Sequence, residues 1–320
     1  MITYRKYNHL TDFIAYKKFA EMNWGKGCHQ SKLSFISWLD SNPNHSINLA
    51  IKNNQVLGCF HEFKAPVLHK NEVKFFYSLH DLMVDKDKTS QLGLKLMQDS
   101  ILQDSPVILS GAVGRISRAY KRLGSYQFKS HWYRKFIFPK SPLRFFFRNQ
   151  KIVNDIQNSM DFLFINNKDE ESISEITKII NEYKYNDEKS MEFFKWRFCH
   201  QNSPLTFFVS DKEYRNIIIF SLGLKKFVPF LRIFSIKNSN ENSIKSMLKS
   251  VEKFASKLGI PVILYAVTED TPPPNYAGFK PYKDMPKSYV FSKKDKDFQE
   301  LIINGFSTDI GFNNIFLKNL

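Results

Sequence analysis

A polar loop that leads into an amphipathic helix is the part of this sequence best suited to chemistry. The loop Asp85–Gln91 contains no apolar residue, and from Leu92 onward apolar side chains recur at helical spacing. The first backbone N–H groups of a helix have no partner within the helix, and the helix dipole adds partial positive charge there. Because this arrangement binds phosphate groups, the loop predicts a phosphate or pyrophosphate site.

The residues before this loop predict a strand that carries two ionisable side chains. Phe75–Val84 is rich in aromatic and β-preferring residues and contains His80 and Asp81. Side chains alternate along a strand, so these two are expected on opposite faces, with only one reaching a given site. A histidine titrates near neutrality and can accept a proton directly or through water. A purely structural role for His80 is the alternative, and His61 and Glu62 are competing candidates.

The pattern of the whole chain predicts two domains with the same order of elements. The first half reads as β-α-α-β-β-β-α-β-α-β, with Gln127–Phe138 as its final strand, and the second half repeats this order weakly. One order occurring twice indicates duplicated domains of about 150 residues each. The predicted boundaries are 1–138 for the first domain, 139–160 for a basic and aromatic connector, and 161–320 for the second domain.

Composition narrows the possible partners. The 320 residues carry a net charge of +16, which favours anionic ligands, although a lysine-rich surface explains it equally well. Cys28, Cys59 and Cys199 are widely separated and form no metal-binding spacing with histidine. We therefore expect no metal, no disulfide framework and a cytoplasmic setting. The longest apolar runs are too short for a membrane span.

Two motifs and the order of elements resemble the GNAT superfamily of acyl-CoA-dependent N-acyltransferases. The segment Leu79–Asp85 resembles the fourth strand of these enzymes, and Ser117–Gly124 resembles their late helix, in which a tyrosine precedes a glycine by four positions. Lys195–Arg197 and Ser307–Ile310 resemble tandem GNAT proteins of bacterial polysaccharide and cell-envelope gene clusters. The resemblance implies an α/β (α+β) fold of two tandem GNAT-like domains, each a mixed central sheet flanked by helices.

The resemblance also implies roles for individual residues. Tyr120 is the candidate acid for the departing thiolate, with packing of its helix as the alternative, and His80 and Asp81 are the candidates for the base. The family's pyrophosphate loop is usually Arg/Gln-x-x-Gly-x-Gly/Ala, and here Gln91 replaces the first glycine while Gly93 is kept. The candidate cofactor-binding residues are Leu82, Met83, Val84, Lys88, Thr89, Ser90, Gln91, Leu92 and Gly93.

The function implied by the resemblance is transfer of an acyl group to an amine. Acetyl-CoA or another acyl-CoA would be the co-substrate, bound by the first domain. The acceptor would be an amino group of a sugar nucleotide or a related small metabolite, with the second domain as an acceptor site or a lid. Two alternatives remain open: a Fem-like transferase that uses aminoacyl-tRNA, and a non-catalytic binding or scaffold protein on a decayed GNAT fold.

Overall fold

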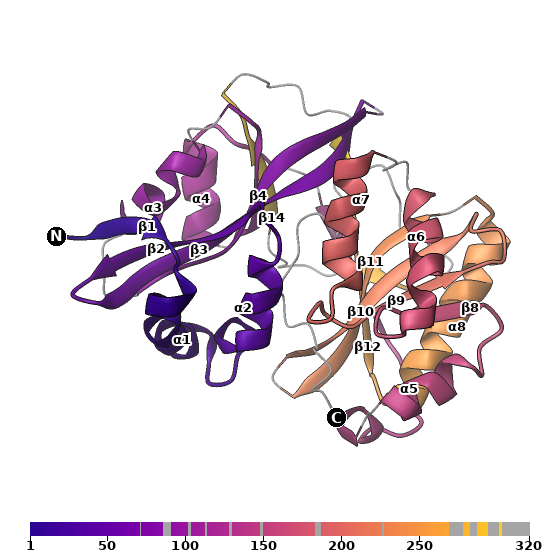
Figure 1. Cartoon of the computed structure of the whole chain (residues 1–320). Helices are drawn as coiled ribbons and strands as arrows, with labels where there is room; N and C mark the ends of the chain where they lie inside the picture. Colours follow the sequence, from indigo (N-terminus) through magenta and orange to yellow (C-terminus); the bar gives the residue numbers. More distant parts are fainter. Residues whose placement is uncertain are drawn as a thin grey trace. The chain divides into compact units, whose positions relative to one another are not determined.

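The computed structural model divides the chain into two compact units (Figure 1). The first consists mainly of Met1–Lys129 together with Pro286–Ile303, and the second consists mainly of Ser130–Met285. It describes residues 1–70, 72–85, 91–101, 104–112, 114–127, 130–147, 150–182, 187–225, 227–237, 239–268, 278–281, 287–293 and 301–302. The predicted site residues Lys88, Thr89 and Ser90, and the segment 307–310, lie outside the described residues. No helix in the described parts of the chain has the length and apolar content needed to cross a membrane.

The first unit is built around a mixed sheet that has eight strands within the described residues, with the path β1-β2-β3-β4-β5-β14-β6 and β15 paired to β3. Only β4 and β5 run parallel among the neighbours in this path. The strands are β1 (Thr3–Lys6), β2 (His45–Lys52), β3 (Gln55–His69), β4 (Glu72–Val84), β5 (Val107–Ala112), β6 (Tyr126–Gln127), β14 (Lys287–Phe291) and β15 (Leu301–Ile302), and the helices are α1 (His9–Trp24), α2 (Leu33–Asp40), α3 (Gln91–Ile101) and α4 (Gly114–Arg122).

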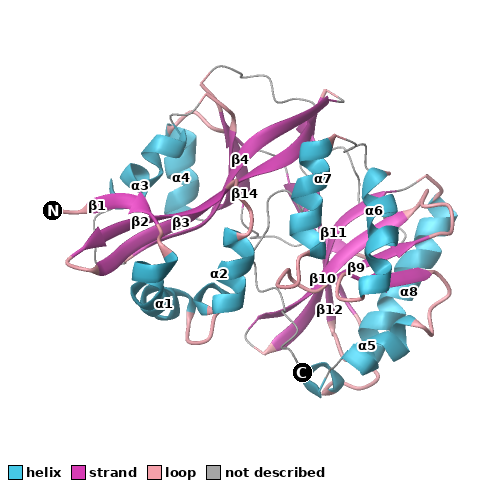
Figure 2. Cartoon of the chain, in the orientation of Figure 1, coloured by secondary structure: helices cyan, strands magenta, loops and turns pink. Residues whose placement is uncertain are grey.

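The second unit has a sheet of seven described strands in the order β8-β9-β10-β11-β12-β7-β13 (Figure 2). Its one parallel pair among the described strands is β11 and β12. The strands are β7 (Ser130–Phe136), β8 (Leu163–Asn166), β9 (Thr206–Ser210), β10 (Ile217–Lys225), β11 (Val228–Lys237), β12 (Val262–Thr268) and β13 (Lys280–Pro281), and the helices are α5 (Gln150–Gln157), α6 (Ile173–Asn181), α7 (Glu188–Phe194), which continues into a π-helical turn at Lys195–Cys199, and α8 (Glu241–Leu258).

The two units repeat one order of elements, which confirms the predicted fold class. The first unit runs β1-α1-α2-β2-β3-β4-α3-β5, and the second runs β8-α6-α7-β9-β10-β11-α8-β12. In each unit a helix joins the two parallel strands in the middle of the sheet. Neighbouring parallel strands run in the same direction, so the chain must return from the end of one strand to the start of the next. A tight turn is too short for this return, and a helix usually provides it.

Helices cover both faces of the first sheet (Figure 1). The predicted apolar positions of α3, Leu92, Leu96, Met97 and Ile101, are buried in one core cluster with residues of β3, β4 and β5. Helices α1 and α2 cover the other face, where Phe19, Phe35 and Trp38 are buried. The helical spacing read from the sequence therefore identified the buried face of α3 correctly.

Each sheet contains a strand from the other half of the sequence. The prediction that Gln127–Phe138 is one strand, the last of the first domain, is wrong. The segment contributes to two sheets, because β6 pairs with β14 in the first unit and β7 pairs with β12 in the second. In the first sheet, β14 takes the corresponding place beside β5. The period of a strand predicts its buried face but not its partner, so the sequence pattern did not reveal this exchange.

The predicted connector 139–160 is part of the second unit. Phe145 and Val153 are fully buried in its core cluster, together with α8. Gly259 ends α8 at a φ of +84°, and a Cβ there would lie 2.4 Å from the carbonyl oxygen of Ser141. Because Phe145 and Val153 fill part of the core, the two prolines lie in a segment that packs on the second unit.

The exchanged strand predicts that a substitution near the C-terminal end destabilises the N-terminal half. Val290 is fully buried in β14, and Val290→Asp places a carboxylate in the first unit's core, a change expected to exceed about 4 kcal/mol. Limited proteolysis followed by mass spectrometry should then show faster cleavage within residues 1–127. The matched control is Val228→Asp, because Val228 is 48% exposed. Unchanged protection of residues 1–127 in Val290→Asp would contradict the strand exchange.

Candidate functional site

A β-bulge interrupts β4 at the position where the sequence predicted chemistry. Cys59 of β3 pairs with Met83, and His61 pairs with His80, so Asp81 and Leu82 together lie opposite the single residue Phe60. Asp81 has a φ of +52°, in the left-handed region. Aspartate enters this region more readily than most residues, and an extra residue of this kind bends a strand and increases its twist.

Strands β4 and β5 separate where the bulge begins. Their parallel pairing covers Tyr77, Ser78 and Leu79 of β4, opposite 107–109 of β5. Beyond Leu79, β4 continues to Val84 and β5 to Ala112 with no further paired residues between these two described segments. The predicted cofactor-binding residues Leu82, Met83 and Val84 therefore lie on the part of β4 that has left its parallel neighbour.

The bulge brings His80 and Asp81 together. The Nδ1 atom of His80 lies 3.4 Å from Oδ2 of Asp81, and both side chains are largely buried. The expectation that they point to opposite faces is therefore wrong, because the left-handed residue breaks the alternation of the strand. Gln30 donates a hydrogen bond to the same carboxylate oxygen at 3.3 Å. His80 and Asp81 thus form a polar pair under the helices α1 and α2.

Two further histidines lie on the same face as this pair. His61 of β3 is fully buried, and its Nε2 atom is 2.8 Å from the hydroxyl of Tyr16 on α1. The ring centroid of His61 lies 5.2 Å from that of His80 and 5.6 Å from that of His45 on β2. The sequence analysis named His61 as a competitor of His80, whereas it missed His45, since the three residues come from three different strands.

Burial and neighbouring charges control the ionisation of this group. Burial lowers the pKa of His61 to about 3, and burial together with His61 and His80 lowers the pKa of His45. Burial alone would raise the pKa of Asp81, but the hydrogen bond and charge of His80, with smaller effects from His61 and His29, lower it overall. An ionised Asp81 beside Nδ1 of His80 favours the proton on Nδ1 and leaves Nε2 as the lone-pair nitrogen.

The start of α3 lies against the same part of β4. Gly93 is the third residue of the helix, and a Cβ there would lie 3.3 Å from Cγ2 of Val84. Leu92 is buried in the core, so only its backbone could meet a ligand, whereas Gln91 is exposed. The retained glycine thus permits close packing of helix on strand, a role that the sequence motif did not separate from phosphate binding.

Tyr120, the predicted acid, lies in the core of the first unit. It is 3% exposed, and its hydroxyl donates to Sδ of Met97 at 3.9 Å. Its ring makes an edge-to-face contact with Tyr289, with the centroids 5.7 Å apart. Burial raises the pKa of Tyr120, which makes the phenol a weaker acid than in water. These contacts show how Tyr120 packs α4, and its role as an acid stays a prediction.

The second unit repeats the backbone features with other side chains. Ile219 pairs with Ser235 and Phe220 with Ile233, so Phe234 is the extra residue on β11, and the pairing of β11 with β12 ends at Ile233. The guanidinium carbons of the buried Arg197 and Arg232 lie 5.9 Å and 5.5 Å from the centroid of the Phe234 ring. An aromatic ring flanked by two arginines thus replaces the histidine and aspartate of the first unit.

The start of α8, the counterpart of α3, is closed by side chains of the protein. The amide oxygen of Asn240 accepts hydrogen bonds from the backbone N–H groups of Asn242 and Ser243. The amide oxygen of Asn216 accepts from those of Ser239 and Asn240. Because asparagine oxygens already bind four N–H groups around this helix start, the second unit offers less to a phosphate than an uncapped helix does.

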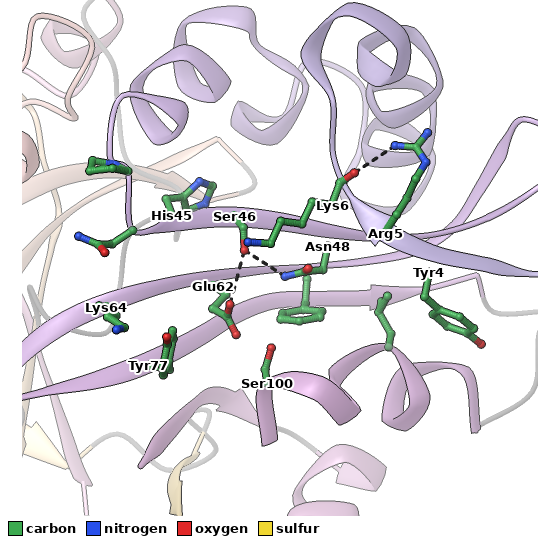
Figure 3. Close-up of a pocket in the computed structure, with 14 residues that line it drawn as sticks. Tyr4, Arg5, Lys6, His45, Ser46, Asn48, Glu62, Lys64, Tyr77 and Ser100 are labelled. Carbon is green, nitrogen blue, oxygen red and sulfur yellow. Dashed lines mark hydrogen bonds between the residues drawn. The ribbon is translucent and has the colours of Figure 1, made fainter. Parts of the chain in front are cut away.

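A polar cavity of about 390 Å³ is lined in part by His45, one of the three histidines (Figure 3). Its walls include Glu62, with Lys6 and Lys64 among the other polar residues. Glu62 accepts a hydrogen bond from Ser46 at 3.5 Å, and burial raises its pKa. Glu62 therefore does not share a site with His61, because neighbouring residues of β3 point to opposite faces.

Comparison of the sequence with known proteins gave no match, either to a protein-family model or to a curated protein. Comparison of the structure gave matches over nearly the whole chain. Saccharomyces cerevisiae N-myristoyltransferase with bound myristoyl-CoA and inhibitors is 9% identical at a TM-score of 0.61, covering 99% of this chain and 86% of that one. A tandem GNAT protein from the clavulanic acid biosynthesis pathway is 11% identical at a TM-score of 0.58, covering 93% and 100%.

A third similar structure is a GCN5-related N-acetyltransferase from Anabaena variabilis, which is 10% identical at a TM-score of 0.56 and covers 91% of this chain and 72% of that one. Identities this low carry information about the fold alone. The matches cover both units of the chain, and the two units repeat one order of elements. The chain therefore has the tandem GNAT fold.

Proposed function

We propose that this chain is an acyl-CoA-dependent N-acyltransferase whose first unit binds the acyl-CoA where β4 separates from β5. The observation that carries the proposal is the bulge at Asp81, which ends the pairing at Leu79 and leaves Leu82–Val84 without paired residues on β5 in the described structure. Backbone N–H groups on such a strand edge can bind the thioester carbonyl and stabilise the charge that develops on its oxygen. The extended arm of a CoA thioester suits this opening.

The first turn of α3 is the proposed pyrophosphate site. The backbone N–H groups of Gln91, Leu92 and Gly93 begin this helix, and Lys88 supplies a charge three residues before Gln91 in the sequence. The corresponding turn of α8 is capped by Asn240 and Asn216. The capped start of α8 favours a donor site in the first unit and a second unit that binds the acceptor or acts as a lid.

His80 is the proposed base, with Asp81 as the group that orients it. The ionised carboxylate 3.4 Å from Nδ1 favours a free lone pair on Nε2, which can accept the proton of the amine directly or through water. Tyr120 remains the proposed acid for the thiolate. The largely buried position of the pair under α1 and α2 requires the acceptor amine to approach from that face of the sheet.

Acetyl-CoA is the proposed donor, and an amino group of a sugar nucleotide or a related small metabolite is the proposed acceptor. The net charge of +16 would favour an anionic acceptor of this kind. The similar structures include an N-myristoyltransferase described with bound myristoyl-CoA, so the acyl length is part of what must be tested. The proposed setting is the cytoplasm, where thiols such as the free Cys28, Cys59 and Cys199 stay reduced.

The donor site predicts one acetyl-CoA bound per chain, measured by isothermal titration calorimetry. Gly93→Val should weaken this binding by at least about tenfold, because the larger side chain pushes the start of α3 away from Val84. Ser243→Val is the matched control, since Ser243 is the third residue of α8 as Gly93 is of α3, and it should leave the affinity unchanged. Circular dichroism checks that both variants are folded.

The same titration separates the proposal from its alternatives. A folded protein that binds neither acetyl-CoA nor a longer acyl-CoA would contradict the transferase and favour a scaffold. Binding of tRNA that weakens steeply with salt, without binding of acyl-CoA, would favour the aminoacyl-tRNA reading. Equal loss of affinity in Gly93→Val and Ser243→Val would contradict the assignment of the donor to the first unit.

The proposed base predicts a loss of turnover without a loss of donor binding. His80→Gln should lower kcat by about 10²-fold or more, as expected when a general base is removed, while acetyl-CoA affinity stays within twofold. Release of the CoA thiol is followed with a nucleoside-diphosphate amino sugar as the acceptor probe. His69→Gln is the control, because His69 is a buried histidine of the same sheet outside the cluster. Equal kcat values for the two variants would exclude His80 as the base.

A further inference from the structure

The three histidines on β2, β3 and β4 form a group whose geometry goes beyond proton transfer. One ring nitrogen of each of His45, His61 and His80 lies within 4.8 Å of the corresponding nitrogen of the other two. Such a group needs no sequence spacing, because adjacent strands place the residues side by side. The expectation of no metal was based on the absence of a Cys/His motif in the sequence. That argument does not cover residues that adjacent strands bring together on one face of the sheet.

These histidines hold buried nitrogen atoms that have no hydrogen-bond partner. They are both ring nitrogens of His45, Nδ1 of His61 and both ring nitrogens of His80, whose Nδ1 faces the carboxylate of Asp81 at 3.4 Å. His61 is fully buried and His80 is 7% exposed, so their polar atoms are removed from bulk water. A buried polar atom without a partner is unfavourable, and several of them in one place call for a ligand.

The remaining contacts involve one nitrogen on each of two rings and leave the other nitrogen available. Tyr16 binds Nε2 of His61 at 2.8 Å, which leaves Nδ1 of that ring available. Asp81 lies 3.4 Å from Nδ1 of His80, which leaves Nε2 available. A carboxylate or hydroxyl on the far nitrogen of a histidine is the usual way in which proteins fix a metal-binding imidazole.

We propose that His45, His61 and His80 bind a transition-metal ion, with Zn²⁺ the best match, through one nitrogen of each ring. Nδ1 of His61 and Nε2 of His80 are the ligand atoms on the two oriented rings, and Asp81 and Tyr16 are their positioning residues. Three imidazoles favour Zn²⁺, Co²⁺, Ni²⁺ or Cu²⁺ over Mg²⁺ and Ca²⁺, which prefer oxygen ligands. Zinc bound by three histidines keeps a fourth position for water or another small ligand.

The spacing of the nitrogens requires only a small adjustment. Tetrahedral zinc with bonds of about 2.0–2.1 Å places its ligand nitrogens about 3.3 Å apart. Rotation of the rings about their side-chain bonds would bring the nitrogens, now within 4.8 Å of one another, to this spacing. His45 is the least buried residue of the three.

Direct titration of metal-free protein with Zn²⁺ tests the site. Calorimetry should show one strong site per chain, weakened at least about 100-fold in His61→Gln and in His45→Gln, the variant closest to solvent. His69→Gln is the matched control and should keep the full affinity. Asp81→Asn should weaken binding by about 10–100-fold, the range seen when a group that orients a metal ligand is removed.

The visible spectrum of the Co²⁺-loaded protein identifies the ligands independently. Tetrahedral bands without a thiolate charge-transfer band are expected for nitrogen ligands. No binding of Zn²⁺ or Co²⁺ by folded protein would overturn the proposal, as would a thiolate band from Cys28 or Cys59. Binding that is unchanged in both His45→Gln and His61→Gln would also overturn it.

A consequence for regulation rests on the proposed function. Because His80 would serve both as a metal ligand and as the base, Zn²⁺ should inhibit acyl transfer, and a chelator should restore it. The two proposals fail separately: an absence of acetyl-CoA binding with intact Zn²⁺ binding removes only the transferase, and the reverse result removes only the metal site.

Discussion

The extra residue in β4 is the local feature on which the candidate site depends. A strand that keeps strict alternation would place His80 and Asp81 on opposite faces and would continue to pair with β5. The left-handed conformation of Asp81 instead bends the strand, ends the parallel pairing at Leu79 and turns the carboxylate toward its neighbouring histidine. One backbone conformation therefore produces both an opening in the sheet and a polar pair beside it.

The second unit shows that this backbone arrangement and its chemistry are separable. Its β11 also has an extra residue near the end of the parallel pairing, yet that residue is Phe234 and its neighbours include two buried arginines. Its helix start is capped by asparagines. A duplicated fold has kept the bulge in both copies, while histidine and aspartate accompany it in only the first.

The exchanged strands make each sheet depend on a strand from the other half of the sequence. Strand β14 completes the first sheet although its residues follow those of the second unit, and β7 completes the second sheet although its residues follow those of the first. Tyr289 and Val290 fill the first unit's core from a distant part of the sequence. Neither half of the sequence contains all the apolar surface that its sheet must bury, so folding of the two halves is coupled.

The sequence by itself determined the elements that local pattern controls. The strand before the polar loop, the buried face of α3 and the repeated order of elements follow from periodicity, and periodicity depends only on neighbouring residues. The motif around Leu79–Asp85 also selected the strand that carries the bulge. Gly93 was recognised as part of a motif, although its packing against Val84 required the structure.

Only the tertiary structure decided which distant residues meet. Strand partners are set by long-range packing, so the exchange of β7 and β14 could not be read from alternation. The left-handed conformation of Asp81 has no signature in a single sequence, since aspartate adopts it in few of its positions. The histidine cluster arises because the sheet aligns three strands, and that alignment places His45 beside two residues to which the sequence gave it no relation.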